Sequence, residues 1–474
     1  MAPVGLRSSG SSVRGTLREV AKLLDLELEG LRPFEHFARS PDAWERISGA
    51  LAGRPFLRSE GMAIVPGTPH LVARPLAERF REIVARFDAF YRAVIGAYYA
   101  DPALRAELLP DPMFERMLEA ERTIAIPLPL TRLDLVITED GGLRVIELNS
   151  VGVCTHHIRT AAYLGRAFAR CGLAEEASRL DWFYDEMIAS IRRFYEGRGH
   201  AVAGSPCVVV LYTSDMFRTS RALWREAFTR RGWRFVACHA GDLEIGPDGA
   251  RVRGERVDVV WGDYLFFFGY QQRRYAQTRF PSRFGDFSAA RAETARIVEH
   301  PDWLRLVADG LACVSPAQAY LAWSKHLLSW IHREDGLLPA AERAWLRAHV
   351  ARTWAVTDRL EGALSADEAV RRRDELLIKP CSYGGSHGVL PGCEASASDW
   401  AARVEEIWRD PDWVVQEFHA PRRAADGQFL SLGLYNYGGR LGGVTLRAGT
   451  SCNVVARDSV FIPAVVEDAD VTGR

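Results

Sequence analysis

The stretch SPCVVVLYTSD, residues 205–215, begins the pattern that most constrains how this chain can fold. An apolar strand is followed by a helix with the sequence SRALWREAFTRRGW, a second strand RFVACHA, a short hairpin and a third strand VDVVWGDY. Strands that alternate with a helix in this order predict a βαβ unit with a mostly parallel sheet. We therefore expect a small βαβ domain over residues 205–290.

Helical and strand-rich stretches lie on either side of this unit. Residues 1–15 are expected to be a flexible start. Residues 16–200 show helical periodicity, as in LAERFREIVARFDAFYRAVIGAYYA, and include a predicted hairpin with the sequence RLDLVITEDGGLRVIELNS. In the region 291–474 helical patterns come first, and five strand patterns follow. The sequence therefore predicts an α+β or α/β protein.

Composition excludes several classes of protein. With 474 residues, of which 48% are hydrophobic and 26% charged, the chain has the composition of a soluble globular protein. Its net charge of -1 provides no field that would attract nucleic acid or an anionic membrane. No apolar run approaches the roughly 20 residues that span a bilayer, and no signal-peptide pattern opens the sequence. We expect a cytoplasmic protein that binds neither nucleic acid nor membrane.

The cysteine and lysine contents are also informative. The eight cysteines include no C-x-x-C pair, so neither a zinc ribbon nor a disulfide framework is expected. Of the 60 basic residues only three are lysine, namely Lys22, Lys325 and Lys379. A chain that uses arginine wherever either cation serves keeps a lysine where a compact ammonium group is needed. This marks Lys325 and Lys379 as candidate functional residues before any motif is considered.

A metal-site pattern lies at the end of the predicted strand LRVIELN. Glu147 and Asn149 are two positions apart, so strand alternation directs both side chains to one face. A carboxylate and an amide oxygen side by side form an oxygen-only site of the kind that Mg²⁺ prefers. Asp134 lies on the partner strand of the predicted hairpin, near enough to contribute. The alternative is a pair of polar residues that closes a strand before a turn.

A second pattern, LLIKPCSYGGSHGV, joins an apolar strand to a glycine-rich loop. Lys379 lies near the strand end, and Gly384, Gly385 and Gly388 free the backbone for close approach to a ligand. Backbone N–H groups in such a loop form an anion-binding concavity, with the lysine as a point charge. The loop is not a Walker motif, because G-x-x-x-x-G-K-[ST] does not occur in the chain. An ordinary turn is the alternative.

Two later stretches contain further candidate binding residues. WVVQEFHAP has three apolar residues before Gln416 and Glu417, which suits a strand linking two domains where an adenine pairs with the backbone. An edge strand with polar residues facing solvent explains the same pattern. GGVTLRAGTSCNVV places Arg447 among small residues, near Gly449 and Asn453.

The order of these elements resembles the ATP-grasp superfamily, and within it the circularly permuted branch of eukaryotic-type glutathione synthetase and glutathionylspermidine synthetase. The motifs of that branch are R-x-D, E-x-N, a lysine on a helix, K-P with a glycine-rich loop, a hinge strand ending in an acid, and a late arginine. In ordinary ATP-grasp enzymes E-x-N follows the lysines, whereas in the permuted branch, as here, it precedes them. The resemblance, which consists of spaced motifs over roughly residues 125 to 465, implies a permuted ATP-grasp fold with a small Rossmann-like βαβ substrate domain and a helical N-terminal region.

The resemblance implies roles at the metal and substrate. Arg132 and Asp134, in TRLDL, would lie beside the substrate and the metal, and Glu147 and Asn149 would hold Mg²⁺. Before its loop glycines glutathione synthetase has a glutamate that is a further metal ligand, and here that position holds Tyr383. Tyrosine is a poor Mg²⁺ ligand, so either Asp134 or another acid completes the coordination, or fewer metal ions bind.

ATP is the other implied cofactor. Lys325, in AWSKHLL, and Lys379 would bind its phosphates, and Gln416 and Glu417 would hold its adenosine end. Arg447 would stabilise the transferred phosphoryl group. The two lysines marked by composition are thus the two that the family requires.

The implied reaction is the ATP-dependent joining of a carboxylate to an amine, through an acyl phosphate, to give an amide, ADP and phosphate. The expected partners are a small-molecule or peptide carboxylate and an amine, and a homodimer is one expected assembly. The glycines of residues 384–388 and 438–443 are candidate lids that exclude water from the acyl phosphate. Two alternatives remain, a small-molecule kinase and a non-catalytic nucleotide-binding protein.

Overall fold

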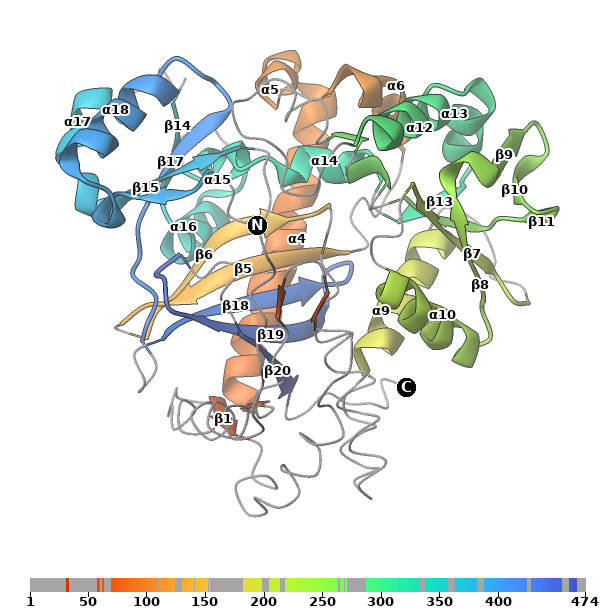
Figure 1. Cartoon of the computed structure of the whole chain (residues 1–474), viewed down its shortest axis with the longest axis horizontal. Helices are drawn as coiled ribbons and strands as arrows, with labels where there is room; N and C mark the ends of the chain where they lie inside the picture. The colour runs from red at the N-terminus through yellow and green to blue at the C-terminus, as the bar shows by residue number, and fades with distance from the viewer. Residues whose placement is uncertain are drawn as a thin grey trace, which may run out of the picture.

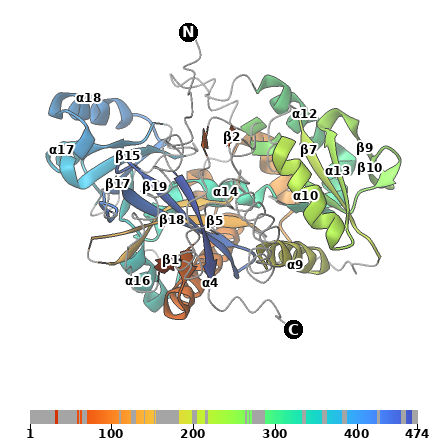
Figure 2. The same cartoon turned by 60° about the horizontal axis from the view of Figure 1, so that its bottom comes forward.

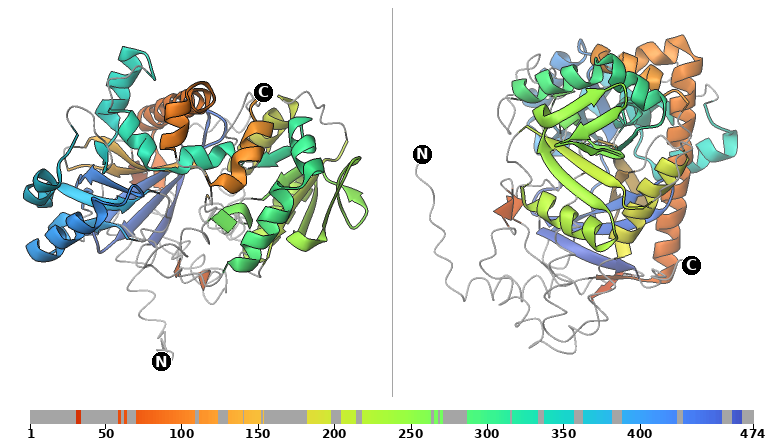
Figure 3. Two further views of the ribbon diagram at one scale, coloured as in Figure 1. Left: turned by 90° about the horizontal axis from the view of Figure 1, so that it is seen from above. Right: turned by 90° about the vertical axis from the view of Figure 1, so that its right-hand side faces the viewer.

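The computed structural model shows a mixed α and β protein with three groups of elements side by side (Figures 1 and 3). The expectation of an α+β protein is therefore confirmed. No helix in the described part of the chain is long and apolar enough to cross a membrane. The structure describes residues 31–33, 58–59, 62–63, 70–108, 111–123, 130–139, 141–151, 153, 182–197, 204–213, 218–262, 265–267, 269–270, 287–314, 316–332, 337–356, 363–381, 388–423, 428–453 and 460–466.

The middle group is a seven-stranded sheet, here called the main sheet, with the order β1-β4-β20-β19-β18-β5-β6. Its neighbouring strands are antiparallel except β20 and β4, which run parallel. Two hairpins that are far apart in the chain, β5 with β6 and β18 with β19, lie next to each other in it (Figure 1). The bounds are Leu31–Pro33 (β1), His70–Val72 (β4), Thr131–Ile137 (β5), Leu143–Asn149 (β6), Phe429–Asn436 (β18), Leu441–Gly449 (β19) and Val460–Val466 (β20).

The long helix α4, Arg74–Ala100, covers one face of the main sheet and contacts β18 and β19 (Figure 2). Its apolar residues recur three and four positions apart, which places them on one side of a helix. Phe80, Val84, Phe87 and Tyr91 are fully buried in this way. Because α4 fills this face with apolar side chains, the opposite face of β5, β6 and β18 is left for polar residues.

The second group contains the expected βαβ arrangement in a four-stranded parallel sheet with the order β13-β12-β7-β8, whose strand β13 lies beyond the expected range 205–290. Helix α10 joins β7 to β8, and after a small antiparallel sheet the chain returns as β12 to the other side of β7. The bounds are Cys207–Tyr212 (β7), Arg218–Arg230 (α10), Arg234–His239 (β8), Leu243–Gly246 (β9), Gly249–Val252 (β10), Glu255–Arg256 (β11), Val259–Trp261 (β12) and Ala312–Val314 (β13).

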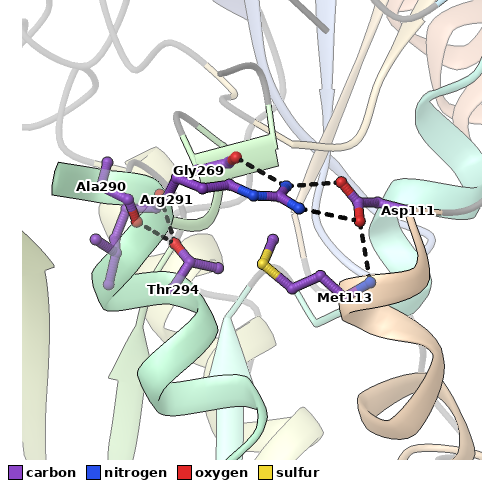
Figure 4. Close-up of polar contacts among 7 residues, drawn as sticks. Asp111, Met113, Gly269, Ala290, Arg291 and Thr294 are labelled. Carbon is purple, nitrogen blue, oxygen red and sulfur yellow. Dashed lines mark hydrogen bonds and ion pairs between the residues drawn. The ribbon is translucent and has the colours of Figure 1, made fainter. Parts of the chain in front are cut away.

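An ion pair joins this second group to the segment that follows α4 (Figure 4). Arg291 donates from Nη1 to Asp111 Oδ2 over 2.7 Å and to the backbone oxygen of Gly269 over 3.2 Å. Asp111 also accepts a hydrogen bond of 3.0 Å from the backbone of Met113. Arg291 lies on α12 (Ser288–Val298), and Asp111 directly precedes η2 (Pro112–Phe114). The other helices of these two parts of the chain are α5 (Pro102–Glu107), α6 (Glu115–Ala120), α9 (Trp182–Glu196) and α13 (Pro301–Ala308).

The third group, residues 353–417, is here called the small lobe and has a hydrophobic core of its own. Its antiparallel sheet has the order β14-β17-β15-β16, and Trp400 packs with Ile378 and Val415 beneath it. The other two groups share a single large core. The bounds are Thr353–Ala355 (β14), Ala366–Arg371 (α17), Arg373–Glu375 (η4), Leu376–Pro380 (β15), Leu390–Pro391 (β16), Gly392–Glu394 (η5), Ala397–Ile407 (α18) and Trp413–Glu417 (β17).

The small lobe meets the main sheet at its edge strand β6. Val350 forms a parallel bridge with Val145, and the backbone N–H of Ala351 donates to the Val145 oxygen over 3.1 Å. Strand β14 begins two residues after Ala351, so the small lobe begins beside β6. Three helices lead the chain from the parallel sheet to this junction, namely α14 (Gln318–Trp323), α15 (His326–Trp330) and α16 (Ala340–His349).

Candidate functional site

An irregularity in strand β6 directs two polar side chains away from the core. The register with β5 shifts at Ile146, which has no partner on β5. Such a bulge turns the following residues to the opposite face. Val145 and Leu148 are therefore both buried in the core although they are three positions apart, and Glu147 and Asn149 share the other side of the strand. The predicted pairing of Glu147 with Asn149 on one face is thus realised beside a bulge.

Arg132 and Asp134 form a bidentate ion pair on the same strand, β5. The Arg132 Nε and Nη2 atoms donate to the two carboxylate oxygens of Asp134 over 2.6 and 2.8 Å. Arg447, on β19, places Nη1 3.5 Å from Asp134 Oδ2. Gly433 on the intervening strand makes this possible, because a Cβ there would lie 3.2 Å from Arg132 Cδ and 2.8 Å from Thr445 Cγ2.

The charges around Asp134 keep it ionised. Burial alone would raise its pKa, but Arg132 and Arg447, with a further contribution from Lys379, outweigh this. The pKa of the Asp134 carboxyl consequently lies below its usual value. The two arginines and this carboxylate form a fixed, charged unit on the polar face of the main sheet.

Lys325 enters the same region from a break between two helices. Helix α14 ends at Trp323, Ser324 has an extended backbone with ψ 127°, and α15 starts just after Lys325. The Lys325 Nζ atom lies 3.0 Å from Glu147 Oε1, and only 2% of its side chain is exposed. Its backbone N–H donates to the oxygen of Cys381, next to the glycine-rich loop. The predicted lysine on a helix therefore sits at a helix junction that points into the site.

A buried acid holds the first turn of the helix that leads to Lys325. The two carboxylate oxygens of Glu121 accept hydrogen bonds of 2.9 Å from the backbone N–H groups of Ala317 and Gln318. Glu121 is fully buried. Sequence reasoning missed this residue, since a glutamate at the end of the amphipathic pattern ERMLEAE looks like an ordinary surface acid.

Lys379, on β15, is held by uncharged oxygen atoms. Its Nζ atom donates to the backbone oxygen of Ile146 over 3.0 Å and to Gln416 Oε1 over 2.8 Å. The Gln416 amide is oriented in turn by Thr353 Oγ1, to which its Nε2 atom donates over 2.9 Å. The bulge in β6 thus also supplies the carbonyl that meets Lys379. The sequence offered no signal for Thr353 or for the Ile146 carbonyl.

Burial makes the ammonium group of Lys379 easier to deprotonate. It lowers the pKa of Lys379 to about 8; Glu147 and Asp134 raise this pKa, whereas Lys325 lowers it. At neutral pH the group is still mainly charged. An anion bound beside it would favour the charged form further.

Six ionisable residues thus converge at the junction of the main sheet and the small lobe. They are here called the charge cluster and comprise Arg132, Asp134, Glu147, Lys325, Lys379 and Arg447. Within this set of described residues, four are cations and two are carboxylates. Cations that outnumber carboxylates at a buried place favour an anionic partner.

The remaining predicted residues are placed as follows. Glu417 lies apart from the charge cluster, with its carboxylate 3.7 Å from His419 Nε2 and 3.9 Å from Arg372 Nη2. Gly388, with φ +74°, fits closely against Pro380 and Trp413, because a Cβ there would lie 3.3 Å from each. Gly384 and Gly385, together with Tyr383, lie outside the described residues.

The glycines of residues 438–443 belong to the hairpin of β18 and β19. Gly438 and Gly439 have φ +61° and +89° and make the turn between β18 and β19. The ring of Tyr437 packs directly on Gly442, where any Cβ would clash with it. These glycines serve a tight hairpin here, and closure of this segment as a lid stays a prediction.

Glu147 and Asn149 fit a hard metal ion. The Asn149 amide nitrogen is buried and makes no hydrogen bond within the described structure, so the fold does not fix which end of the amide faces the site. No group of three or more histidine, cysteine or acidic residues suited to a metal ion occurs in the described ranges. Mg²⁺ is commonly held by one or two carboxylates together with substrate phosphates, and this donor set matches that pattern.

No protein-family model matches the chain, and no curated protein matches its sequence. Among solved structures, the chain is similar to a protein from Methylobacillus flagellatus KT that is provisionally described as a gamma-glutamylcysteine synthetase. The TM-score is 0.36 and the sequence identity 9%, with 77% of this chain and 82% of the other covered. A likeness at this level is too weak to assign a family.

Proposed function

We propose that this protein is an ATP-dependent carboxylate–amine ligase of the circularly permuted ATP-grasp type. The observation that carries the proposal is the charge cluster, in which four cations from separate elements of the described structure meet two carboxylates at a largely buried junction. ATP with one bound Mg²⁺ carries net negative charge, which suits a site where cations outnumber carboxylates among the described residues.

The residues divide into metal, phosphate and substrate roles. Glu147 and Asn149 would hold Mg²⁺, which neutralises phosphate charge when bound. Lys325 and Lys379, which approach from a helix junction and from β15, would contact the phosphates from two sides. Gln416 orients Lys379 and would thereby act at the phosphate end of ATP, a role that differs from the adenosine contact expected from the sequence.

The arginines are suited to the reacting groups. Arg447 and Arg132 are fixed by one carboxylate, Asp134, so their guanidinium groups need little reorganisation as charge develops. The substrate carboxylate would attack the γ-phosphate, which releases ADP and gives an acyl phosphate. The amine then displaces phosphate and forms the amide. Phosphoryl transfer of this kind depends on positioning and charge neutralisation, which the cluster offers.

The order of the motifs supports the permuted branch. Glu147 lies on β6, ahead of Lys325 and Lys379 in the chain, and the late Arg447 returns on β19 to the same sheet. The parallel sheet over residues 207–314 is proposed to bind part of the acid or the amine, because open parallel sheets bind ligands at the carboxyl ends of their strands.

An ADP-release screen tests this function. The chain is incubated with ATP, Mg²⁺ and pools of carboxylates with and without amines, and products are identified by mass spectrometry. Amine-dependent ADP release with an amide product supports the ligase. A phosphorylated product without amine identifies a kinase, and ATP binding without ADP release identifies a non-catalytic binder.

Two variants make the screen specific. Lys379→Ala is expected to lower turnover by on the order of 10²- to 10³-fold, as is typical when one charge-stabilising donor is removed. Arg409→Ala in the same lobe is the matched control, because this arginine is 81% exposed and pairs only with Glu405 among its described contacts. Equal turnover in both variants contradicts the assignment.

A further inference from the structure

Two of the residues proposed to act on different parts of the ligand are paired with each other. Lys325, a candidate phosphate-binding cation, and Glu147, a candidate metal ligand, form an ion pair of 3.0 Å. The lysine side chain is 2% exposed and the glutamate 22%, so the pair is sheltered from solvent and only weakly screened. In this state the Lys325 charge is largely neutralised by Glu147.

A metal ion and the ammonium group of Lys325 would compete for this one carboxylate, whose Oε1 atom already faces Lys325. Its single negative charge is already matched by Lys325, and a divalent cation beside it would repel the lysine, whose side chain is nearly fully buried. Mg²⁺ also demands near-octahedral geometry, which leaves little room for a cation on the same oxygen atoms. Occupation of Glu147 by a metal would therefore favour release of Lys325 toward a nearby anion.

We infer that Glu147 and Lys325 form a partner-exchange switch that makes nucleotide binding depend on the metal. This inference rests on the proposed function. Without metal, Lys325 is neutralised by Glu147, whose carboxylate would repel the phosphates. With metal, Glu147 binds the ion and Lys325 binds phosphate.

Lys379 differs from Lys325 in that its described partners carry no charge. Its described contacts are to neutral oxygens, the Ile146 carbonyl and the Gln416 amide, so no carboxylate must be displaced before it meets phosphate. Lys379 is therefore available to ATP whether or not metal is present. The exchange is confined to Lys325.

A double-mutant cycle on ATP affinity tests the switch, with dissociation constants measured by calorimetry in Mg²⁺ and in EDTA. For the unaltered chain, affinity is expected to fall by about tenfold or more in EDTA. In Glu147→Gln, metal-free ATP is expected to bind at least about threefold more tightly than to the unaltered chain, because Lys325 is released. Glu405→Gln, on the exposed face of α18, is the matched control and should leave both affinities unchanged.

The double variant Glu147→Gln with Lys325→Met distinguishes two explanations of the gain in metal-free affinity. One is release of Lys325, and the other is loss of the repulsion between the Glu147 carboxylate and the phosphates. If Glu147→Gln acts by freeing Lys325, the gain in metal-free affinity disappears in the double variant. A gain that persists without Lys325 overturns the switch, and so does a Glu147→Gln variant with no gain. If the unaltered chain binds ATP neither in Mg²⁺ nor in EDTA, the proposed function is overturned instead.

Lysine labelling gives a second readout that needs no substitution in the pair. The chain has only three lysines, so ¹³Cε-lysine labelling yields few NMR signals to assign. At saturating ATP in EDTA the Lys379 signal is expected to shift while that of Lys325 stays in place, and addition of Mg²⁺ should then move the Lys325 signal. Movement of both signals in EDTA contradicts the inference.

Discussion

The Nζ atom of Lys379 lies 2.8 Å from the Oε1 atom of Gln416, across two paired strands of the small lobe. The pairing register places Lys379 diagonally opposite Gln416, so both side chains share one face of the sheet. Thr353, on the strand beyond, fixes the amide so that its oxygen faces the lysine. Three neighbouring strands thus determine where one buried ammonium group points.

Gln416→Leu is expected to weaken ATP binding by about tenfold, because a charge-assisted hydrogen bond to a buried lysine is lost. The pKa of Lys379 should fall further below about 8 in this variant, since the charged form loses a partner. Calorimetric titration with ATP and Mg²⁺ measures the affinity. Thr353→Val should have a smaller effect of the same sign, because the lysine keeps its acceptor. Unchanged affinity in Gln416→Leu contradicts this view of the site.

The affinity for ATP is expected to depend on pH through Lys379. Phosphate favours the charged ammonium, so ATP binding should take up protons near pH 8 and weaken as pH rises above that value. Calorimetry in two buffers of different ionisation enthalpy measures the proton uptake. Lys379→Arg keeps its charge throughout this range and should show no uptake there. Equal uptake by both proteins excludes Lys379 as the source.

The lowered pKa of Lys379 also affects the stability of the ligand-free protein. The folded pKa of Lys379 lies below its unfolded value, so the unfolded chain binds more protons between about pH 8 and about pH 10.4. This group's contribution to the free energy of unfolding therefore rises with pH in that window. Urea titrations of the unaltered chain and of Lys379→Met should diverge in slope against pH over this range. If the free energy of unfolding changes with pH equally in both proteins, Lys379 makes no such contribution.

Glu121→Gln is expected to lower the free energy of unfolding by about 1–3 kcal/mol, because a buried carboxylate that accepts two backbone N–H groups is replaced by an amide with one acceptor oxygen. Urea denaturation measures the change. Glu119→Gln, two residues earlier and 54% exposed, is the control and should stay within about 0.5 kcal/mol. Equal effects at both positions would show that Glu121 does not anchor α14.

Gly433→Ala is expected to reduce turnover by about ten- to a hundredfold, because the added methyl group would clash with Thr445 at 2.8 Å and crowd the Arg132 side chain at 3.2 Å. Steady-state ADP release measures this loss. Gly96→Ala, within α4, has nothing within 4 Å of the new methyl group and should instead raise the free energy of unfolding by about 0.5–1 kcal/mol. Full turnover in Gly433→Ala argues against a catalytic position for Arg132.

Local patterns were sufficient to predict the elements that present the candidate site. The hairpin of β5 and β6, the parallel sheet and the strands β15 and β17 all follow from apolar alternation and short turns. The scarcity of lysine identified Lys325 and Lys379, which the structure brings to one place. These features depend on residues close together in the chain, which is why sequence reasoning reaches them.

Features that depend on contacts between distant segments were not predictable in this way. The bulge at Ile146 becomes visible only when β5 sets the register, and its carbonyl meets Lys379 only because the small lobe docks on β6. Gln416 was expected to contact adenosine, yet its partner is a lysine on the neighbouring strand. The sequence likewise offered no sign that the ring of Tyr437 packs on Gly442 within the hairpin of β18 and β19.

Calorimetric titration of MgATP into the unaltered chain and into the Lys325→Met, Lys379→Met double variant tests the central claim most directly. We predict binding of one nucleotide per chain that is lost in the double variant, with urea denaturation used to verify that the double variant is folded under the conditions of the titration. Binding of equal affinity to both proteins would show that the two lysines do not form a nucleotide site, and would contradict the account.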